Sequence, residues 1–258
     1  MTSQDDKEFP DGAALVIGGS GGIGAGICRC LAERGVNVVL TYRSNRAAAE
    51  RAAESVRAAG AQAAIRQLEL TDPVAVAEAV HAAAAEFQRL HTVVLAVGAD
   101  ISMSFVGEVS TDEWMRTIDG DLNGSFHVIK AALPLMRKTG GGSFVALTSA
   151  GLSRHAQKDI LSIVPKAGVE ALMRGVAREE GRYGIRANSV ALGVIDGGLF
   201  DRIRERVDGR FIEAMKSNTA LRRFGTVREA AETTVFLASS KAGFITGQSL
   251  AVDGGFTV

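Results

Sequence analysis

The chain of 258 residues has no net charge and almost no cysteine. Lysine and arginine number 29, as do aspartate and glutamate, so general binding to nucleic acid or to a charged membrane surface is not indicated. Cys28 and Cys30 lie two positions apart in a helical segment, so they point in different directions and cannot hold a metal ion together. We expect no metal site, and two buried or unreactive thiols in a reducing cytoplasm.

Long apolar runs are also missing. No segment approaches the length of a bilayer span, and residues 1–10 are polar and lack the apolar centre of a signal peptide. We therefore expect a cytoplasmic protein without a membrane partner, with a flexible tail over residues 1–10. Residues 11–258 contain no linker, repeat or low-complexity break, and their length suits a single α/β domain.

The most informative segment that is present covers residues 13–24, AALVIGGSGGIG. The apolar residues from Ala13 to Ile17 do not alternate with polar ones, which predicts a short buried strand. The glycines that follow allow a sharp turn and a close approach to a ligand, and helical spacing begins at Ile23. A glycine cluster alone would fit a flexible turn. Between a strand and a helix N-terminus it predicts a phosphate-binding turn for a dinucleotide.

Strands and helices alternate along the rest of the chain. We expect strands near residues 36–42, 61–68, 91–97, 143–148, 185–192 and 248–252, and helices over 46–59, from 73, and over 111–138, 162–182, 199–217 and 227–238. Such alternation predicts a parallel sheet with helices on both faces. The ligand then lies beyond the carboxyl ends of the strands, where the glycine turn also lies.

The glycine spacing from Gly18 to Gly24 resembles that of the short-chain dehydrogenase/reductase family, and so do segments along nearly the whole chain. They read KAGV at 166–169, GIRAN at 184–188, LRRFG at 221–225, ITG at 245–247 and VDGG at 252–255. The resemblance implies a single-domain, Rossmann-type, doubly wound parallel sheet of about seven strands. It also implies a nicotinamide cofactor on the glycine turn, held by Gly18, Ser20, Gly21, Gly22, Ile23 and Gly24.

The end of the second strand bears on which cofactor is used. An NAD site places a carboxylate there, but this chain reads Thr41-Tyr42-Arg43-Ser44. Arg43, helped by Ser44, can pair with a 2′-phosphate, so NADP(H) is expected in preference to NAD(H). The alternative is that Arg43 is a solvated loop charge, and the uncharged Gly21 weakens the case, because many NADP-using relatives carry a basic residue there. The resemblance also assigns cofactor contacts to Glu69, Leu70, Gly98, Gly193 and Ile195.

The catalytic positions depart from the family pattern. Lys166 is the lysine that family members use to hold the nicotinamide ribose, and Ser149 is the serine that holds the substrate oxygen. Ser162 stands where the family has its proton-transferring tyrosine, and Asp121 stands where it has an asparagine. The two tyrosines of the chain, at 42 and 183, fall in other parts of it.

A serine hydroxyl is far less acidic than a phenol, whose pKa is about 10, so the proton must take another path. Some enoyl-reducing relatives keep Ser-x-x-x-Lys and supply a tyrosine elsewhere, which this chain does not show. His155, Lys158 and Asp159 can reach the site, although each reads as readily as an ordinary loop residue. The loss of the tyrosine hinders ketone reduction more than conjugate reduction, because an enolate is delocalised and can be protonated later.

Two functions follow. The first is an NADP(H)-dependent oxidoreductase that reduces a carbonyl or a conjugated enone or enoyl compound with an unusual proton path. The second is a nucleotide-binding relative that has lost catalysis and serves as a sensor or an assembly partner. The retained Ser149, Lys166 and glycine turn favour the enzyme.

Two further expectations concern the surroundings of the site. The resemblance implies a substrate lid over about 197–220, where family members carry a substrate-covering segment, and this region has an apolar stripe that arginines surround. The stripe is formed by Leu199, Ile203, Val207, Phe211 and Met215, and the arginines are Arg202, Arg204, Arg206 and Arg210. Either this is a solvated basic face, or it binds a small-molecule substrate with an anionic handle, such as an acyl thioester. The resemblance also implies a homotetramer, because family members pair through the helices that here cover about 111–138 and 162–182 and through the C-terminal strand. The apolar residues of these helices and of the C-terminus agree with such pairing.

Overall fold

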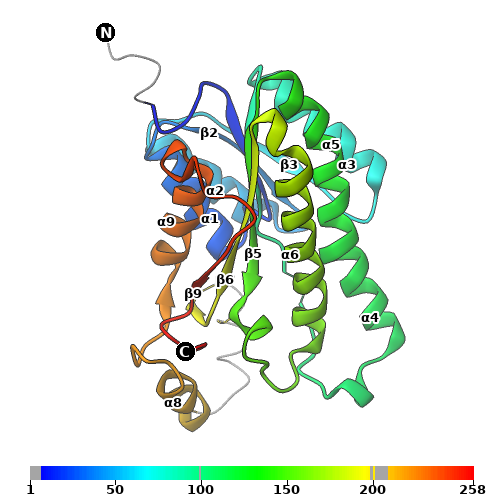
Figure 1. Ribbon diagram of the computed structural model, residues 1–258, viewed down its shortest axis with the longest axis vertical. Coiled ribbons are helices and arrows are strands. Elements are labelled where there is room, and N and C mark those ends of the chain that lie inside the picture. Colours follow the sequence, from blue (N-terminus) through cyan, green and yellow to red (C-terminus); the bar gives the residue numbers. More distant parts are fainter. Residues whose placement is uncertain (1–6, 99, 198–199, 201–208) are drawn as a thin grey trace.

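The computed structural model describes residues 7–98, 100–197, 200 and 209–258. Its centre is a seven-stranded sheet in the order β3-β2-β1-β4-β5-β6-β9, in which every neighbouring pair is parallel (Figure 1). The strands are β1 (Ala13–Ile17), β2 (Asn37–Tyr42), β3 (Ala63–Gln67), β4 (Leu90–Leu95), β5 (Gly142–Ser149), β6 (Ile185–Leu192) and β9 (Ser249–Val252). The predicted Rossmann-type fold is therefore confirmed.

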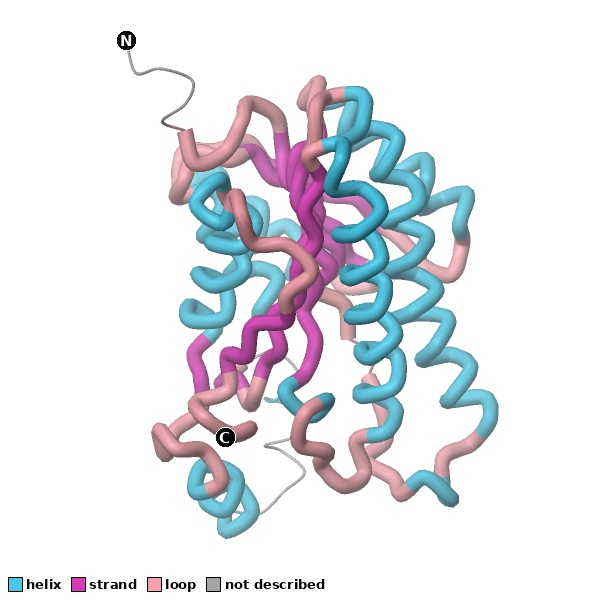
Figure 2. The backbone as a smooth tube through the Cα atoms, in the orientation of Figure 1, coloured by secondary structure: helices cyan, strands magenta, loops and turns pink. Residues whose placement is uncertain are grey.

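Helices cover both faces of this sheet, as Figure 2 shows. One apolar core lies between the sheet and α1, α2 and α9, and the other lies between the sheet and α3, α5 and α6. The described helices are α1 (Gly22–Ala32), α2 (Arg46–Ala58), α3 (Pro73–Glu86), α4 (Thr111–Thr117), α5 (Gly124–Lys138), α6 (Ile160–Glu180), α8 (Gly209–Ser217) and α9 (Val227–Ala238). Among them, no helix has both the length and the apolar character that crossing a bilayer requires.

The run of apolar residues in β1 follows from this layering. Leu15 is paired with Val39 of β2 and Val93 of β4, and it packs into the core beneath α3, α5 and α6. The next residue, Val16, points to the opposite face and packs into the core beneath α1, α2 and α9. Because both faces of the strand are buried, both sets of side chains are apolar.

The helical region expected over residues 111–138 is confirmed, and it contains a turn that the sequence pattern did not predict. A π-helical turn, Ile118–Asn123, separates α4 from α5. Gly124, the first residue of α5, packs closely against Leu70, which follows β3, because a Cβ on Gly124 would lie 2.6 Å from the Leu70 Cβ. Only glycine permits this approach.

The rim of the sheet carries a small second sheet that the sequence pattern did not predict. Its strands β7 (Ile195–Asp196) and β8 (Gly225–Thr226) are parallel, with Ile195 opposite Gly225. The segment between them was expected to form one helix over 199–217, and α8 accounts for its last nine residues. The predicted lid residues 198–199 and 201–208, including most of the apolar stripe and its arginines, lie outside the described residues.

Residues 7–10, which the sequence analysis placed in the tail, contact the body of the domain. Phe9 is buried in the core beneath α1, α2 and α9. The Glu8 carbonyl accepts a hydrogen bond from the Ser240 N–H at 2.9 Å, and the Glu8 carboxylate pairs with Arg34 and Lys241. Residues 1–6 of the expected tail lie outside the described residues.

Candidate active site

The turn between β1 and α1 is held in shape by backbone contacts that exclude larger residues. Gly18 has φ +75°, and a Cβ on Gly24 would lie 2.2 Å from the Gly18 carbonyl oxygen. The Gly18 N–H donates to the Thr41 hydroxyl at 3.0 Å, which ties the turn to the end of β2. Gly18 and Gly24 therefore shape the turn from within, where any side chain would displace backbone.

The first turn of α1 is open to an anion. Its N-cap residue is Gly21, which offers no side-chain cap, and the first turn contains no acidic residue. The first backbone hydrogen bond of the helix runs from the Ala25 N–H to the Gly21 carbonyl at 2.7 Å. The N–H groups of the residues between them have no acceptor within the helix, so the positive helix end is available to a phosphate. This donor set fits the pyrophosphate of a dinucleotide.

A cavity of about 530 Å³ opens beside this turn. It lies at the carboxyl ends of β1, β4, β5 and β6, where an open α/β sheet binds its ligands. Eleven of the residues assigned to the site from the sequence line it. They are Ser20, Gly21, Gly22, Ile23, Gly24, Gly98, Ser149, Ser162, Lys166, Gly193 and Ile195.

Six assigned residues do not line the cavity. Gly18 lies within the turn itself, and the other five lie on other segments. Arg43 and Ser44 are exposed in the loop after β2, Glu69 and Leu70 follow β3, and Asp121 is buried in the π-helical turn. The loop after β2 is held near the glycine turn, because the Ser20 N–H donates to the Thr41 carbonyl at 3.3 Å. Leu70 packs on Gly124, and its carbonyl lies 3.1 Å from a ring nitrogen of His127.

Ser149, Ser162 and Lys166 meet at one side of the cavity. Ser149 ends β5, and its Oγ accepts the Gly151 N–H at 3.1 Å. Ser162 and Lys166 lie four residues apart on α6, so their side chains share a face of that helix. The Lys166 Nζ donates to the Val97 carbonyl at 3.2 Å, which draws the ammonium group to the end of β4.

Three further candidate residues from the sequence, His155, Lys158 and Asp159, lie in the connection between β5 and α6. Lys158 points away, because its Nζ lies 4.6 Å from the centre of the Phe105 ring. His155 is exposed. Asp159 is half-buried, and burial raises its pKa to about 6, although the positive charges of Lys166 and His155 oppose this rise. None of the three lines the cavity, and Asp159 is the least exposed of them.

Neither tyrosine of the chain lines the cavity. Tyr42 is buried in β2. Tyr183 lies after α6, at the opposite end of the sheet from the cavity, where the Arg137 guanidinium is 5.0 Å from its ring centre. Both side chains lie outside the cavity lining.

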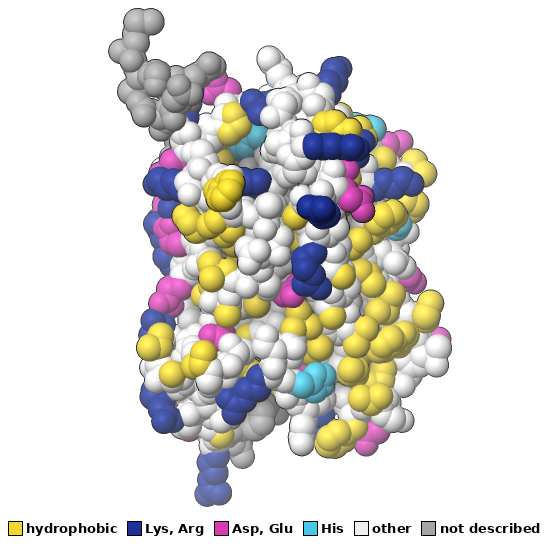
Figure 3. Space-filling view, viewed as in Figure 1, with side chains coloured by type: hydrophobic (Ala, Val, Ile, Leu, Met, Phe, Trp, Pro, Cys, Tyr) yellow, Lys and Arg dark blue, Asp and Glu magenta, His cyan; other side chains and the backbone are white. Residues whose placement is uncertain are grey.

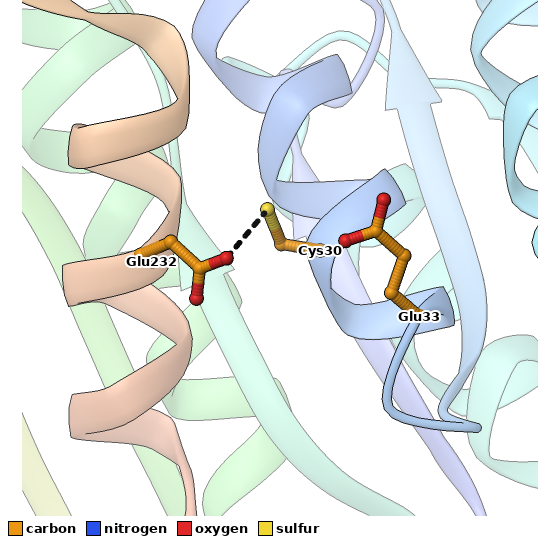
Figure 4. A group of neighbouring side chains, drawn as sticks. All are labelled: Cys30, Glu33 and Glu232. Atoms are coloured by element: carbon orange, nitrogen blue, oxygen red, sulfur yellow. Dashed lines mark hydrogen bonds between the residues drawn. The ribbon is translucent and has the colours of Figure 1, made fainter.

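A second group of polar side chains, away from the cavity, is formed by Cys30, Glu33 and Glu232 (Figure 4). Arg228 pairs with both carboxylates, at 2.6 Å from Glu33 and 2.5 Å from Glu232. Arg34 also pairs with Glu232, and burial raises the pKa of the Cys30 thiol. The negative charges are therefore neutralised by arginines and the thiol stays protonated, so we interpret the group as a structural contact between α1 and α9.

The sequence reasoning missed several residues of the cavity wall. Val97 supplies the acceptor for Lys166, Phe200 and Val194 contribute apolar surface, and Thr148 lies beside Ser149. Phe200 is buried edge-on against Phe224, with 4.6 Å between the ring centres. Their contributions depend on backbone and tertiary contacts, for which the sequence has no local signal.

Comparison with known proteins agrees with this geometry. A family model described as enoyl-(acyl carrier protein) reductase matches residues 18–257. The 3-oxoacyl-[acyl-carrier-protein] reductase FabG of Staphylococcus aureus is 32% identical over 243 residues, which cover 94% of this chain and 97% of that protein.

Solved structures agree as well. A short-chain type dehydrogenase/reductase from Mycobacterium ulcerans has a TM-score of 0.90 and 34% identity, covering 97% of this chain and 91% of that one. A blue fluorescent protein from a metagenomic library, solved in complex with NADPH, has a TM-score of 0.86 and 32% identity, covering 96% of this chain and 98% of that one.

Proposed function

The chain belongs to the short-chain dehydrogenase/reductase family, and on this premise we propose that it is an NADP(H)-dependent oxidoreductase that reduces a carbonyl or conjugated enoyl compound. The observation that carries the proposal is the convergence of the anion-ready end of α1, Ser149 and Lys166 on one cavity. When bound, the reduced nicotinamide would supply a hydride to the substrate carbon. The relatives named for acyl-carrier-protein substrates support an acyl thioester as the substrate class.

The residues of the site would bind different parts of the cofactor and the substrate. Gly22, Ile23 and Gly24 would hold the pyrophosphate by their N–H groups, and Lys166 would hold the nicotinamide ribose. Ser149 can donate its hydroxyl proton to a substrate oxygen, because its Oγ already accepts the Gly151 N–H. Arg43 would pair with the 2′-phosphate, and the apolar Phe200 and Val194 would exclude water from the reacting atoms.

NADPH oxidation tests the proposal directly. The purified protein is mixed with NADPH and, in separate reactions, with acetoacetyl-coenzyme A, a simple ketone or an enoyl thioester, and cofactor absorbance is followed. We expect oxidation that depends on at least one substrate. Tight NADPH binding without turnover of any of the three would instead support the sensor or assembly function.

Substitution of Ser162 is expected to have a modest effect. Ser162 lines the cavity one helical turn before Lys166, but its hydroxyl is too weak an acid to protonate an alkoxide. Ser162→Ala should therefore lower kcat by less than the roughly 10²–10⁴-fold that the loss of a general acid costs. Steady-state kinetics with acetoacetyl-coenzyme A measures this effect. A fall to background would make Ser162 the proton donor.

We also propose that the protein is a homotetramer. Figure 3 shows apolar side chains gathered over the side of the molecule that carries α4, α5 and α6. Met115 of α4 and Phe126 of α5 are 50% and 46% exposed, and Leu250 on the edge strand β9 is 43% exposed. Pairing of these surfaces between copies would cover apolar area that water now contacts. Light scattering should give about four times the 27.0 kDa of one chain, and a mass near 27.0 kDa would contradict the proposal.

A further inference from the structure

Among the described residues, the Asp159 carboxyl at the start of α6 has no hydrogen-bond or ion-pair partner. The backbone carbonyl of Asp159 accepts the N–H groups of Ser162 and Ile163, at 3.1 and 3.0 Å, so the first helical turn fixes its main chain. The side chain makes no capping hydrogen bond, and within the described residues neither a salt bridge nor a hydrogen bond holds it. Partly burying such a group costs free energy, and buried polar groups are ordinarily hydrogen-bonded.

Asp159 shares a small volume with the substrate-binding serine. A Cβ built on Gly151 would lie 3.1 Å from the Ser149 Oγ and 3.6 Å from the Asp159 Oδ2. Both oxygens therefore border the same point in the connection between β5 and α6. The Ile163 Cδ1 lies 2.5 Å from that point and forms its apolar side. The carboxyl and the Ser149 hydroxyl therefore lie close together beside an apolar side chain.

The charged groups around Asp159 favour its role as a proton donor. Lys166 on α6 and His155 in the preceding loop are the positive groups that act on it. Burial outweighs them and raises the pKa of Asp159 to about 6. An acid in this range is partly protonated near neutral pH, and its conjugate base is stabilised by Lys166.

We propose that Asp159 supplies the proton of the reduction, in place of the tyrosine that the family carries at the position of Ser162, and that the Ser149 hydroxyl passes this proton to the substrate oxygen. The inference rests on the proposed function. It makes Asp159 a proton-supplying residue that acts through Ser149. The chain therefore needs no tyrosine in its cavity.

The proposed reduction combines a hydride transfer with a proton relay through Ser149. Hydride from the reduced nicotinamide, the reductant, forms a C–H bond at the substrate carbon, and the carbonyl π pair moves onto oxygen. The substrate oxyanion takes the hydroxyl proton of Ser149, and the Ser149 oxygen takes the carboxyl proton of Asp159. The O–H bond of the carboxyl breaks, leaving a carboxylate beside Lys166 that regains a proton from solvent.

Kinetics of Asp159→Asn, which keeps the shape of the side chain and removes its proton, test the inference. With acetoacetyl-coenzyme A as the probe, kcat of the unmodified protein should fall by about tenfold for each pH unit above the pKa of the acid. Asp159→Asn should lower kcat by about 10²-fold or more near pH 6, abolish this pH dependence and change KM little. Asp159→Glu should recover part of the rate and the pH dependence. Asp112→Asn, at an exposed position of α4, is the matched control and should behave as the unmodified protein.

Two readouts are independent of turnover. The Kd of NADPH, measured by fluorescence, should be the same for Asp159→Asn and the unmodified protein, which shows that the variant folds. NMR of isotope-labelled aspartate carboxyl carbons should show Asp159 titrating near pH 6. The Asp159 signal is assigned as the one that is absent from the spectrum of Asp159→Asn. In Lys166→Met this titration should move to higher pH, because a positive neighbour is lost.

The outcomes separate the two proposals. An Asp159→Asn protein with unchanged kcat and pH profile would overturn the role of Asp159 and leave the oxidoreductase intact. Titration of Asp159 in the ordinary range of aspartate would overturn that role whatever the activity. NADPH binding without turnover of any probe by the unmodified protein would overturn the oxidoreductase proposal, and the role of Asp159 with it.

Discussion

Replacement of Lys166 by methionine is expected to lower kcat/KM for NADPH-dependent reduction by about 10²–10³-fold, the usual effect of removing one preorganised donor from an active site. The Lys166 Nζ is fixed by the Val97 carbonyl at 3.2 Å, and its charge also acts on Asp159. Methionine keeps an unbranched side chain that is one atom shorter, and it removes both the hydrogen bond and the charge. Steady-state kinetics at several pH values measure the loss.

The pH profile adds a second test of the same substitution. Loss of the positive charge should raise the pKa of Asp159, so the remaining activity should persist to higher pH than in the unmodified protein. Lys130→Met, at an exposed position of α5, is the matched control and should retain full activity. If Lys166→Met kept more than half of the original kcat/KM, Lys166 would have no role in cofactor binding or catalysis.

Substitution of Arg43 by alanine should remove most of the preference for NADPH over NADH. Arg43 is exposed just after β2, and no carboxylate occupies the end of that strand. Its backbone carbonyl accepts the Gln67 Nε2 at 2.9 Å, which positions the loop, while the guanidinium extends into solvent. Hydrogen bonds to charged groups contribute about 1.5–3 kcal/mol. The Kd of NADPH should therefore rise by roughly 10–100-fold, with the Kd of NADH unchanged.

Fluorescence titration with both cofactors measures this effect. Arg46 cannot take over the role without breaking its ion pair with Glu50, whose Oε1 lies 2.8 Å from the Arg46 Nε. Arg51→Ala, at an exposed position of α2, is the matched control, and it should leave both affinities unchanged. Equal affinities of the unmodified protein for the two cofactors would show that Arg43 is only a solvated charge.

Features that depend on short stretches of sequence were predicted well. The apolar run before the glycines and the helical spacing after Ile23 predicted β1, the turn and α1, because both signals are local. The spacing of Ser162 and Lys166 predicted that they share one face of α6, and both line the cavity. The bounds of α9 were predicted to the residue, and its capping box between Thr226 and Glu229 is a local signal at its start.

Features that depend on distant contacts were not predicted. The π-helical turn before α5 has no signal in the spacing of apolar residues, and the two residues of β7 are too few to carry a periodic signal. The burial of Phe9 depends on the packing of the whole domain. Asp159 could be identified from the sequence only as one of three polar loop residues. Its partial burial and its position beside Ser149 distinguish it, and both are tertiary properties.

The central claim is that this cavity transfers a hydride from NADPH to a substrate carbon. NADPH carrying deuterium at both positions of the nicotinamide C4 is incubated with the protein and acetoacetyl-coenzyme A, and the product is analysed by mass spectrometry and NMR. We predict one deuterium on the former carbonyl carbon, and about 10²–10³-fold less of this labelled product from Lys166→Met over the same time at subsaturating substrate. Oxidation of NADPH without deuterium in the product, or equal amounts of labelled product from both proteins, would contradict this prediction.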